Sequence, residues 1–288
     1  MKNEKHTFTS SCDTSLFEFL RANLTSKSRN NIKTLLKNGF CAVDGKIQTQ
    51  FDAPVKKGQT VTVSGENAMR HSLPFRILYE DEKIVVIDKP AGLLSVANEK
   101  EKERTAYRIL SDYVKSADRS AKIFVVHRLD RDTSGILLFA KDAGTKAAFQ
   151  ENWDSLVIRR GYTAVCEGTP AAESGVLTSY LRESTGHMVY STDSKKHSQK
   201  AITKYSVIKS NGRFSLLDIE IETGRKNQIR VQLSEFGHPV AGDKKYGAET
   251  NPLKRLALHA SVLELRTPYG NSLKFISKAP DSFRAICR

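Results

Sequence analysis

Residues 127–142, HRLDRDTSGILLFAKD, join a highly charged loop to an apolar strand. Residues 127–132 hold three side chains that can be positive and two carboxylates. The uncharged run ILLFA (136–140) indicates a strand buried on both faces, and residues 133–135, Thr-Ser-Gly, indicate the turn that leads into it. We therefore expect the charges in a loop held against a rigid strand, which is a common way to position a reactive group.

The charges of this loop allow two interpretations. A carboxylate between arginines, such as Asp130 between Arg128 and Arg131, is expected to stay ionised at neutral pH because opposite charges favour the charged form. The loop is then either a structural cluster of arginines and aspartates that holds the turn, or the carrier of a reactive carboxylate. For an arbitrary loop, the structural interpretation is the more common one.

The composition points to a basic globular protein. The 288 residues contain 46 Lys and Arg against 32 Asp and Glu, a net charge of +14. A surplus of this size favours a polyanionic partner, nucleic acid first, over a general effect on solubility. The hydrophobic content of 39% and the charged content of 27% are otherwise ordinary for a globular protein.

Several classes of protein are not expected. The four cysteines lie far apart without a C-x-x-C pair, so neither a zinc site nor a disulfide framework is predicted. The first residues lack the apolar segment of a signal peptide, and no run approaches the roughly 20 apolar residues of a membrane span. These features indicate a cytoplasmic protein with reduced thiols.

Two helices are expected near the start of the chain. Residues 15–24 place their apolar side chains on one helical face, and residues 27–37 do the same, with Ser26 as candidate N-cap and Gly39 as the stop. Three cations recur every four residues along the second helix and form a basic stripe: Arg29, Lys33 and Lys37. Such a stripe is usually a solvated face, but in a chain this basic it favours contacts with phosphate groups.

The sequence divides into an N-terminal module at 13–65, a linker at 66–75 and a large domain at 76–288. Beyond the linker, many short β segments alternate with a few helices, and strands are expected at 157–168 and through 216–233. This pattern predicts an α+β domain with a mixed, mostly antiparallel sheet.

Four segments in this order resemble the motifs of the RluA-type pseudouridine synthases. HRLDRDTSG before an apolar strand resembles the family's signature, and ILYEDEKIVVIDKPAG (77–92) resembles its first motif. RGYTAVCEG (160–168) is similar to its tyrosine-bearing strand, and TGRKNQIRVQLSEFGHPVAGDKKYG (223–247) to its third motif. Residues 13–65 resemble the αL RNA-binding module shared with a small-subunit ribosomal protein, a common attachment in this family. The resemblance implies the pseudouridine synthase fold and an RNA isomerase.

The resemblance also assigns roles, position by position. It implies that Asp130 is the catalytic aspartate and that Arg230 forms an ion pair with it. Tyr162 would stack on the target base, and its hydroxyl is the only nearby proton carrier that the motifs supply. Arg128 would enter or brace the RNA.

Other charged residues of these motifs are expected to have structural roles. His127 and Asp132 would hold the turn and take no part in catalysis, and Lys89 either lines the pocket or fixes the Lys-Pro-Ala-Gly turn. The sequence departs from the family's usual pattern at three positions, which leaves fine substrate contacts open: Arg160, Lys226 and Asn227.

The implied reaction breaks the bond between ribose and the uracil ring nitrogen, turns the base and rejoins it through a ring carbon. Nothing is added or lost, so no cofactor and no metal are expected, in agreement with the absence of Gly-rich nucleotide-binding motifs from the sequence. A carboxylate can stabilise, attack or deprotonate a cation-like sugar. Asp130 would therefore either attack the sugar or remove its 2′ proton. Extruding the base costs a few kcal/mol, and stacking on an aromatic ring, worth about 1–3 kcal/mol, offsets much of that cost.

Two other interpretations stand beside this one. A non-catalytic RNA-binding or ribosome-assembly protein on the same fold would be expected to lack Asp130, Tyr162 or Arg230, and all three are present. A base-removing glycosylase would use the same carboxylate but release free uracil. The resemblance favours ribosomal RNA of the large subunit over transfer RNA as the substrate, and we expect a monomer without membrane association.

Overall fold

A computed structural model describes residues 5–25, 27–37, 39–64, 73–99 and 101–288. The chain divides into two compact units. The first comprises the chain up to Arg76 together with residues 107–123, and the second comprises residues 77–106 and 124–288. The expected N-cap Ser26 and most of the expected linker lie outside the described residues.

The part of the first unit that precedes Arg76 packs two helices against a small antiparallel sheet. Helix α1 (Leu16–Asn23) begins where Ser15 Oγ accepts a hydrogen bond from Glu18 N, and α2 (Arg29–Lys37) begins where Ser28 Oγ accepts from Asn31 N at 3.2 Å. Both expected helices are present. The sheet has the order β1-β6-β3-β4, and β2 pairs with β5. The strands are β1 (Lys5–Thr9), β2 (Thr14–Ser15), β3 (Cys41–Val43), β4 (Lys46–Ile47), β5 (Pro54–Val55) and β6 (Thr60–Ser64).

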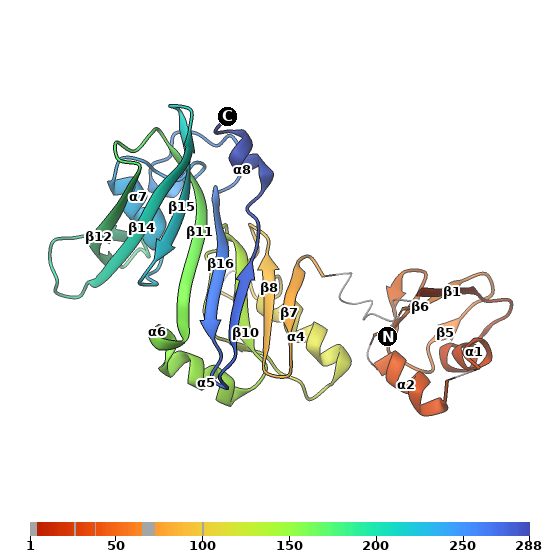
Figure 1. The fold of residues 1–288 in the computed structure, drawn as a ribbon. Helices are drawn as coiled ribbons and strands as arrows, with labels where there is room; N and C mark the ends of the chain where they lie inside the picture. The colour runs from red at the N-terminus through yellow and green to blue at the C-terminus, as the bar shows by residue number, and fades with distance from the viewer. Residues whose placement is uncertain (1–4, 26, 38, 65–72, 100) are drawn as a thin grey trace. The chain divides into compact units, whose positions relative to one another are not determined.

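Within the described part of the second unit, 11 strands form one sheet (Figure 1). Its main path runs β13-β12-β14-β15-β11-β16-β10-β8-β7, with β17 beside β16 and β9 beside β10. All of these pairings are antiparallel except β10 with β16, so the predicted α+β class and mostly antiparallel sheet are confirmed. The strands are β7 (Arg76–Glu80), β8 (Ile84–Lys89), β9 (Phe124–Val125), β10 (Ser134–Ala140), β11 (Val157–Glu167), β12 (Ser174–Glu183), β13 (Val189–Ser191), β14 (Gln199–Ser210), β15 (Phe214–Ile221), β16 (Leu258–Arg266) and β17 (Ser272–Ile276).

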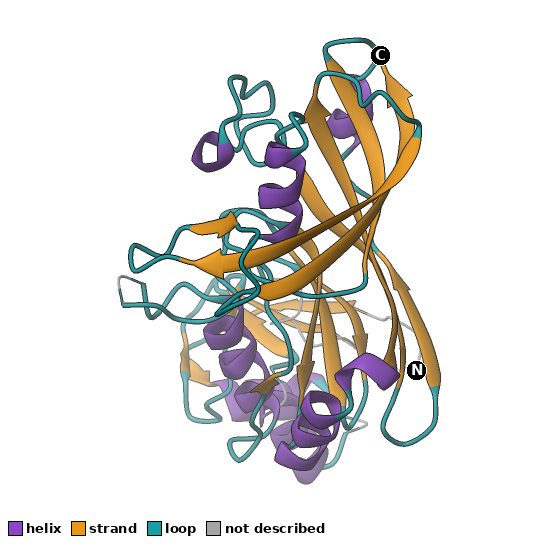
Figure 2. Cartoon of the chain, turned by 90° about the vertical axis from the view of Figure 1, so that its left-hand side faces the viewer, coloured by secondary structure: helices purple, strands orange, loops and turns teal. Residues whose placement is uncertain are grey.

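Short helices pack against this twisted sheet, whose strands turn strongly from one end of the unit to the other (Figure 2). Helix α5 lies against β10 and β9, and α7 lies against β12, β13 and β14. The helices of the chain after residue 100 are α4 (Ala106–Ala117), α5 (Ala143–Glu151), α6 (Trp153–Leu156), α7 (Gln228–Glu235), the 3-10 helix η1 (Lys244–Tyr246) and α8 (Asp281–Ala285).

Helix α7 corrects the strand that was expected to continue through residues 216–233. The alternation of Ile229, Val231 and Leu233 is typical of a strand, but the strand β15 ends at Ile221. The contacts of Gln228 and Gln232 explain why this segment forms a helix and not a strand. One turn apart on a helix, both are buried and donate through Nε2 to backbone carbonyls of β14, at 2.9 and 3.1 Å.

The charged loop of residues 127–132 is anchored by the strand that follows it, β10. Every residue of β10 is buried, between β8 on one side and β16 on the other, as its apolar sequence predicts. Gly135 lies in this strand with φ +110°, and a Cβ there would stand 2.2 Å from Ala260 O. Only glycine therefore allows β10 to approach β16 so closely, and this approach fixes where the charged loop ends.

Candidate active site

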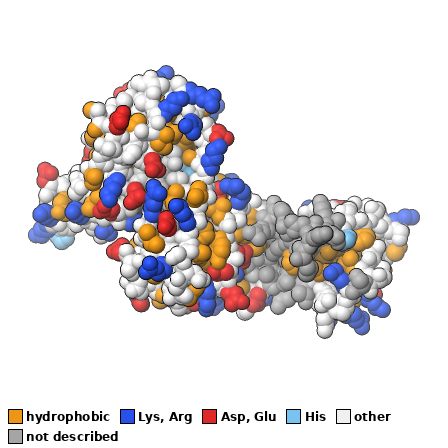
Figure 3. Space-filling model, viewed as in Figure 1, with side chains coloured by type: hydrophobic (Ala, Val, Ile, Leu, Met, Phe, Trp, Pro, Cys, Tyr) orange, Lys and Arg blue, Asp and Glu red, His pale blue; other side chains and the backbone are white. Residues whose placement is uncertain are grey.

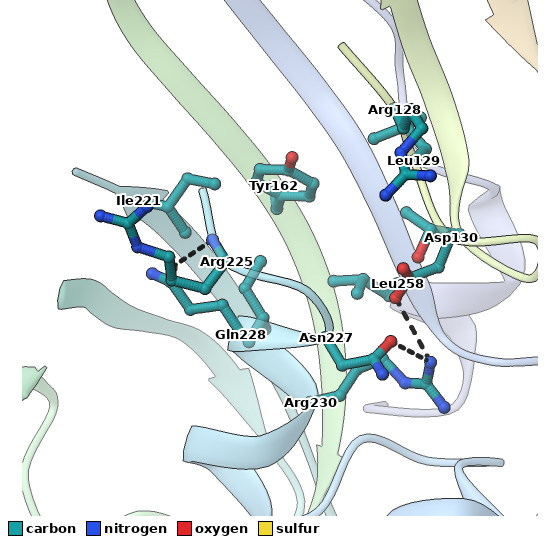
Figure 4. Close-up of a pocket in the computed structure, with 12 residues that line it drawn as sticks. Arg128, Leu129, Asp130, Tyr162, Ile221, Arg225, Asn227, Gln228, Arg230 and Leu258 are labelled. Carbon is teal, nitrogen blue, oxygen red and sulfur yellow. Dashed lines mark hydrogen bonds and ion pairs between the residues drawn. The ribbon is translucent and has the colours of Figure 1, made fainter. Parts of the chain in front are cut away.

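The charged loop forms one wall of a pocket of about 390 Å³ in the second unit (Figure 4). Four residues singled out from the sequence meet here: Arg128 and Asp130 from the loop, Tyr162 from β11, and Arg230 from α7. In Figure 4, Arg128 and Asp130 lie on one side of Tyr162, and Arg225 lies on the other. The remaining lining residues are Leu129, Thr133, Ile221, Asn227, Gln228, Ile229 and Leu258.

Backbone hydrogen bonds hold the loop on both sides of Asp130. Ser95 Oγ donates to Leu129 O at 2.7 Å and accepts from Leu129 N at 3.1 Å, so one buried hydroxyl satisfies both backbone groups of that residue. On the other side, Gly92 N donates to Arg131 O at 2.9 Å. The carboxylate is therefore carried by a loop whose path is determined by the DKPAG segment and the residues after it.

Lys89 lies behind this loop and is completely buried. Its ammonium group uses its three N–H donors on three backbone carbonyls, those of Leu93 at 2.7 Å and of Pro90 and Arg131 at 3.0 Å. Burial lowers the pKa of Lys89 to about 7, against the opposing charges of Asp132 and Asp130. Because it does not line the pocket, the geometry fits the structural one of its two expected roles.

Arg230 links Asp130 to a second carboxylate that the sequence analysis did not single out. Its Nη1 lies 3.3 Å from Asp130 Oδ2, while Nε and Nη2 donate to the two oxygens of Asp243 at 2.6 and 2.8 Å. Nη1 also donates to Asn227 Oδ1 at 2.9 Å, and the guanidinium lies over the Tyr246 ring, 4.9 Å from its centroid. These contacts determine the plane of the guanidinium and direct one of its edges toward Asp130.

The two carboxylates differ in their exposure. The side chain of Asp243 is 2% exposed and that of Arg230 is 12% exposed, whereas Asp130 keeps 31% of its side chain exposed. Burial alone would lower the pKa of Arg230, but the hydrogen bonds and charge of Asp243, with the charge of Asp130, raise it above its ordinary value. Arg230 thus stays charged, and Asp130 stays accessible from the pocket.

Asn227 connects α7 to this arrangement. It precedes the helix with φ 54°, a left-handed conformation that asparagine tolerates better than most residues. Its Oδ1 binds Arg230, and its Nδ2 donates to the Tyr246 hydroxyl at 2.9 Å. Asn227 is one of the positions at which the sequence departs from the family's pattern, and in the structure its side chain holds Arg230.

Tyr162 lies on β11 at an irregularity of the sheet. The register between β11 and β16 shifts between Gly161 and Tyr162, and such a bulge re-aims side chains. Burial raises the pKa of Tyr162 to about 12; the charge of Arg160 opposes this shift and that of Asp130 adds to it. The phenol therefore stays protonated at neutral pH.

His127 and Asp132 have different surroundings. His127 Nε2 accepts a hydrogen bond from Leu138 N at 3.1 Å, and its ring packs against Trp153 with centroids 5.3 Å apart. Burial, and then the charge of Arg160, lower the pKa of His127 to about 4, so this residue is neutral and structural. Asp132 forms an ion pair with its exposed neighbour Arg131 at 3.2 Å.

The basic residues expected to bind phosphate lie in the first unit. Arg29 and Lys33 line a surface pocket with Phe51, whose side chain is 58% exposed. The Arg29 guanidinium also lies 5.8 Å from the centroid of the Phe17 ring. Lys37 ends α2, and its side chain lies outside what the structure describes.

Three residues of the pocket region were not predicted, namely Asp243, Arg225 and Gln228. No local pattern marks them, because an aspartate after glycine is common in turns and the other two stand among polar residues. The placement of Arg225 and Gln228 follows from the turn before α7, where Arg225 N donates to Gln228 Oε1 at 3.0 Å.

The part of the chain that the structure describes also bears on metal sites and membrane-spanning helices. Among the described residues, no group of three or more His, Cys, Asp and Glu side chains is placed to hold a metal ion. Within the same residues, no helix combines the length and apolarity needed to cross a bilayer. On the face seen in Figure 3, Lys and Arg side chains are interspersed with acidic ones over the second unit.

Comparisons with known proteins place the chain among RNA pseudouridine synthases. A family model described as RNA pseudouridylate synthase matches residues 83–235. The chain is 33% identical to a Bacillus subtilis protein named as an uncharacterized RNA pseudouridine synthase, over 81% of this chain and 80% of the relative. It is 29% identical to the ribosomal large subunit pseudouridine synthase D of Borreliella burgdorferi, over 92% of this chain and 86% of that protein. The structure of human RNA pseudouridylate synthase domain containing 4 superposes with a TM-score of 0.60 at 25% identity, covering 72% of this chain and 90% of the other.

Proposed function

Because the chain belongs to the RNA pseudouridylate synthase family and isomerises uridine to pseudouridine, we propose that its substrate is ribosomal RNA of the large subunit. Relatives from Borreliella burgdorferi and Vibrio cholerae that are named as large-subunit enzymes match about nine-tenths of the chain. The net charge of +14 supports a large polyanionic substrate. Transfer RNA is the alternative.

One observation carries the assignment of the catalytic residues. Asp130, Tyr162 and Arg230 come from separate parts of the chain and line one pocket, where Arg230 forms an ion pair with Asp130. We assign Asp130 to the ribose, where its carboxylate attacks the sugar or removes the 2′ proton as the bond to the ring nitrogen breaks. The detached uracil turns against the ring of Tyr162 and rejoins the sugar through its ring carbon, which then loses its proton.

We propose that Arg230 positions Asp130 and leaves its carboxylate free to act on the sugar. Its two short hydrogen bonds go to Asp243, and only the 3.3 Å contact goes to Asp130. Asp130 therefore keeps its charge available for the reaction. Arg128 lines the same pocket and is exposed, so it can hold the RNA strand from which the base is extruded.

The first unit is proposed to add affinity for RNA. Residues 13–65 would form an αL-type module, in which Arg29, Lys33 and Lys37 contact phosphates. The exposed ring of Phe51 beside Arg29 and Lys33 supports this proposal, because aromatic and cationic side chains together suit single-stranded RNA.

Mapping of pseudouridines tests the proposed substrate. RNA from cells that lack this gene should lose pseudouridine at one or a few positions of large-subunit ribosomal RNA, and the gene restored in trans should return them. Loss confined to transfer RNA would overturn the ribosomal assignment while leaving the reaction itself intact.

A pair of isosteric variants tests the role of Asp130. Asp130→Asn should abolish pseudouridine formation and leave folding and RNA affinity near those of the wild type, because the shape is kept and the charge is lost. Asp132→Asn is the matched control: it removes a neighbouring carboxylate whose ion pair, with Arg131, lies at the surface, and it should retain activity. Activity of Asp130→Asn above a few per cent would refute the assignment.

An assay for free uracil in the same reactions distinguishes an isomerase from a glycosylase.

A further inference from the structure

The pocket around Asp130 opens into a longer cleft of the second unit. Arg128, Asp130 and Tyr162 line both, and the cleft extends from them to Trp153 and Arg160. With its open mouth, it encloses about 1600 Å³, far more than one pyrimidine ring occupies. When the target base enters the pocket, the continuous ribose-phosphate chain keeps the nucleotides beside it close to the pocket, and this cleft is the space that adjoins it.

Trp153 is the one tryptophan of the chain, and it forms part of the cleft wall. It is the first residue of α6, is partly buried, and also lines a second cavity next to the cleft. Its ring packs on that of His127, which in turn is fixed by its hydrogen bond from Leu138 N. The indole is therefore supported on one side and borders open space on the other.

Two arginines stand beside this indole with their guanidinium groups fixed by backbone carbonyls. Arg160 donates to Glu222 O, and Arg225 Nε donates to Lys200 O at 3.2 Å. Both line the cleft and the second cavity. Asp154 and Glu222 line the second cavity with them, but among the described residues neither arginine has a carboxylate oxygen within ion-pair distance, so their remaining N–H groups can bind an anion. Gly224 lies against Arg160, where an added Cβ would stand 2.6 Å from Arg160 Nη1 and would displace that guanidinium.

We propose that Trp153, Arg160 and Arg225 form a subsite for the nucleotide next to the target uridine. The base of this nucleotide stacks on the indole, and its phosphate lies against the two guanidinium groups. Every base presents a π face, so the subsite accepts any base but requires it to be unpaired. The subsite rests on the proposed RNA substrate and adds a preference for uridines whose neighbour is single-stranded.

Tryptophan fluorescence reports directly on this subsite, because Trp153 is the only indole. Asp130→Asn would be titrated with uridine 5′-monophosphate and with single-stranded oligonucleotides that extend on either side of one uridine. The oligonucleotides should quench the emission of Trp153, and the mononucleotide should not. Unchanged emission at oligonucleotide concentrations that saturate the protein in a filter-binding assay would overturn the proposal.

Steady-state kinetics provide the second test, with single substitutions made in a protein that keeps Asp130. Trp153→Ala should raise KM for single-stranded RNA by roughly 5- to 150-fold with kcat largely retained, whereas Trp153→Phe keeps a π face and should raise it much less. Tyr269→Ala is the control, since Tyr269 is an aromatic residue that is 41% exposed outside the cleft. An unchanged KM for Trp153→Ala would refute the subsite while pseudouridine still forms. A wild-type protein that forms none would instead refute the proposed function.

Discussion

Arg230 divides its hydrogen bonds unequally between two carboxylates, with the shorter pair on Asp243 and the longer contact on Asp130. A buried ion pair of this kind is retained when its remaining groups are also satisfied, and here Asn227 and the Tyr246 ring complete the surroundings of the guanidinium. Such an arrangement keeps the guanidinium in place independently of its contact with Asp130. At the scale of single residues, Asp243 is therefore as important for the site as Arg230.

Asp243→Asn tests this dependence. The substitution leaves a buried guanidinium without its main counter-charge, so the free energy of unfolding should fall by about 3–5 kcal/mol. Arg230 should also turn toward Asp130, and kcat should fall while KM for RNA changes little. Urea denaturation and single-turnover kinetics measure the two effects. Asp132→Asn is the reference, because loss of its exposed ion pair should change stability by less than about 1 kcal/mol. Wild-type stability and kcat in Asp243→Asn would show that Arg230 needs no such support.

Tyr162→Phe separates the two roles of the phenol. The ring still stacks in this variant, so the base should still detach and turn. We propose that the hydroxyl carries the proton released from the ring carbon, so we expect release of that hydrogen to slow by about 10²–10⁴-fold. With a pKa near 12, the phenol is protonated, so it can accept the proton from the ring carbon only if it passes its own proton to another group. Asp130 lines the same pocket and can receive that proton. Single-turnover release of tritium from that carbon is the measurement. Release at the wild-type rate would leave Tyr162 as a stacking platform.

The elements that position the site were predictable to different degrees. The strand β10 and its loop could be predicted because an uncharged run after a Thr-Ser-Gly turn has few other solutions. Helix α7 could not, because its apolar residues alternate like those of a strand, and its helical form depends on the contacts of Gln228 and Gln232 with β14. Strands β12 and β13 were not predicted either, since much of their sequence is polar and exposed.

The same contrast applies to the site itself. Asp130, Tyr162 and Arg230 could be found from local motifs, and they share a pocket in the structure. The pairing of Arg230 with Asp243 could not, because it depends on how the segment after α7 folds back on the helix. Sequence patterns thus indicate which groups meet in the pocket, whereas tertiary packing determines which groups hold them.

The pH dependence of the free energy of unfolding of His127→Gln tests the hydrogen bond between His127 in the loop and Leu138 in strand β10. The pKa of His127 is about 4 in the folded protein, below its ordinary value of 6.5, so the unfolded chain takes up the proton first as the pH falls. Stability that is fully present above pH 6.5 should therefore be lost between pH 6.5 and pH 4, by up to about 3 kcal/mol. Glutamine can accept the same hydrogen bond without titrating. Urea denaturation at pH 7 and pH 4.5 should show a smaller loss for His127→Gln, and equal losses would exclude His127 as the titrating group.

At the scale of the whole molecule, the positive charge is divided between the two units. The second unit carries the pocket and the cleft, and the first carries Arg29 and Lys33 beside the exposed Phe51. In the proposed function, the second unit carries out the reaction and the first unit adds affinity for RNA. Changes in the first unit should then alter RNA binding and its dependence on salt more than the rate of the chemical step.

A charge-neutralising pair of substitutions measures that contribution. Arg29→Gln with Lys33→Gln should lower the slope of log affinity against log salt by roughly 0.7 for each phosphate contact with single-stranded RNA that is lost. The control, Lys274→Gln with Lys278→Gln, removes the same net charge from two cations that are already paired with carboxylates. Binding titrations over a range of salt concentrations compare them. If both pairs leave the slope unchanged, the basic stripe of α2 is only a solvated face.

The parallel pairing of β10 with β16 has a consequence for how the protein reaches its active form. Ser134 is paired with His259, so the strand that anchors the Asp130 loop is completed only by a segment near the other end of the chain. Contacts between residues so distant in sequence form late and slowly, since the intervening chain must first be closed into a loop. A nascent chain still lacking β16 should therefore hold no competent pocket. In refolding experiments, catalytic activity should return only with the slowest phase, which makes isomerisation a sensitive reporter of complete folding.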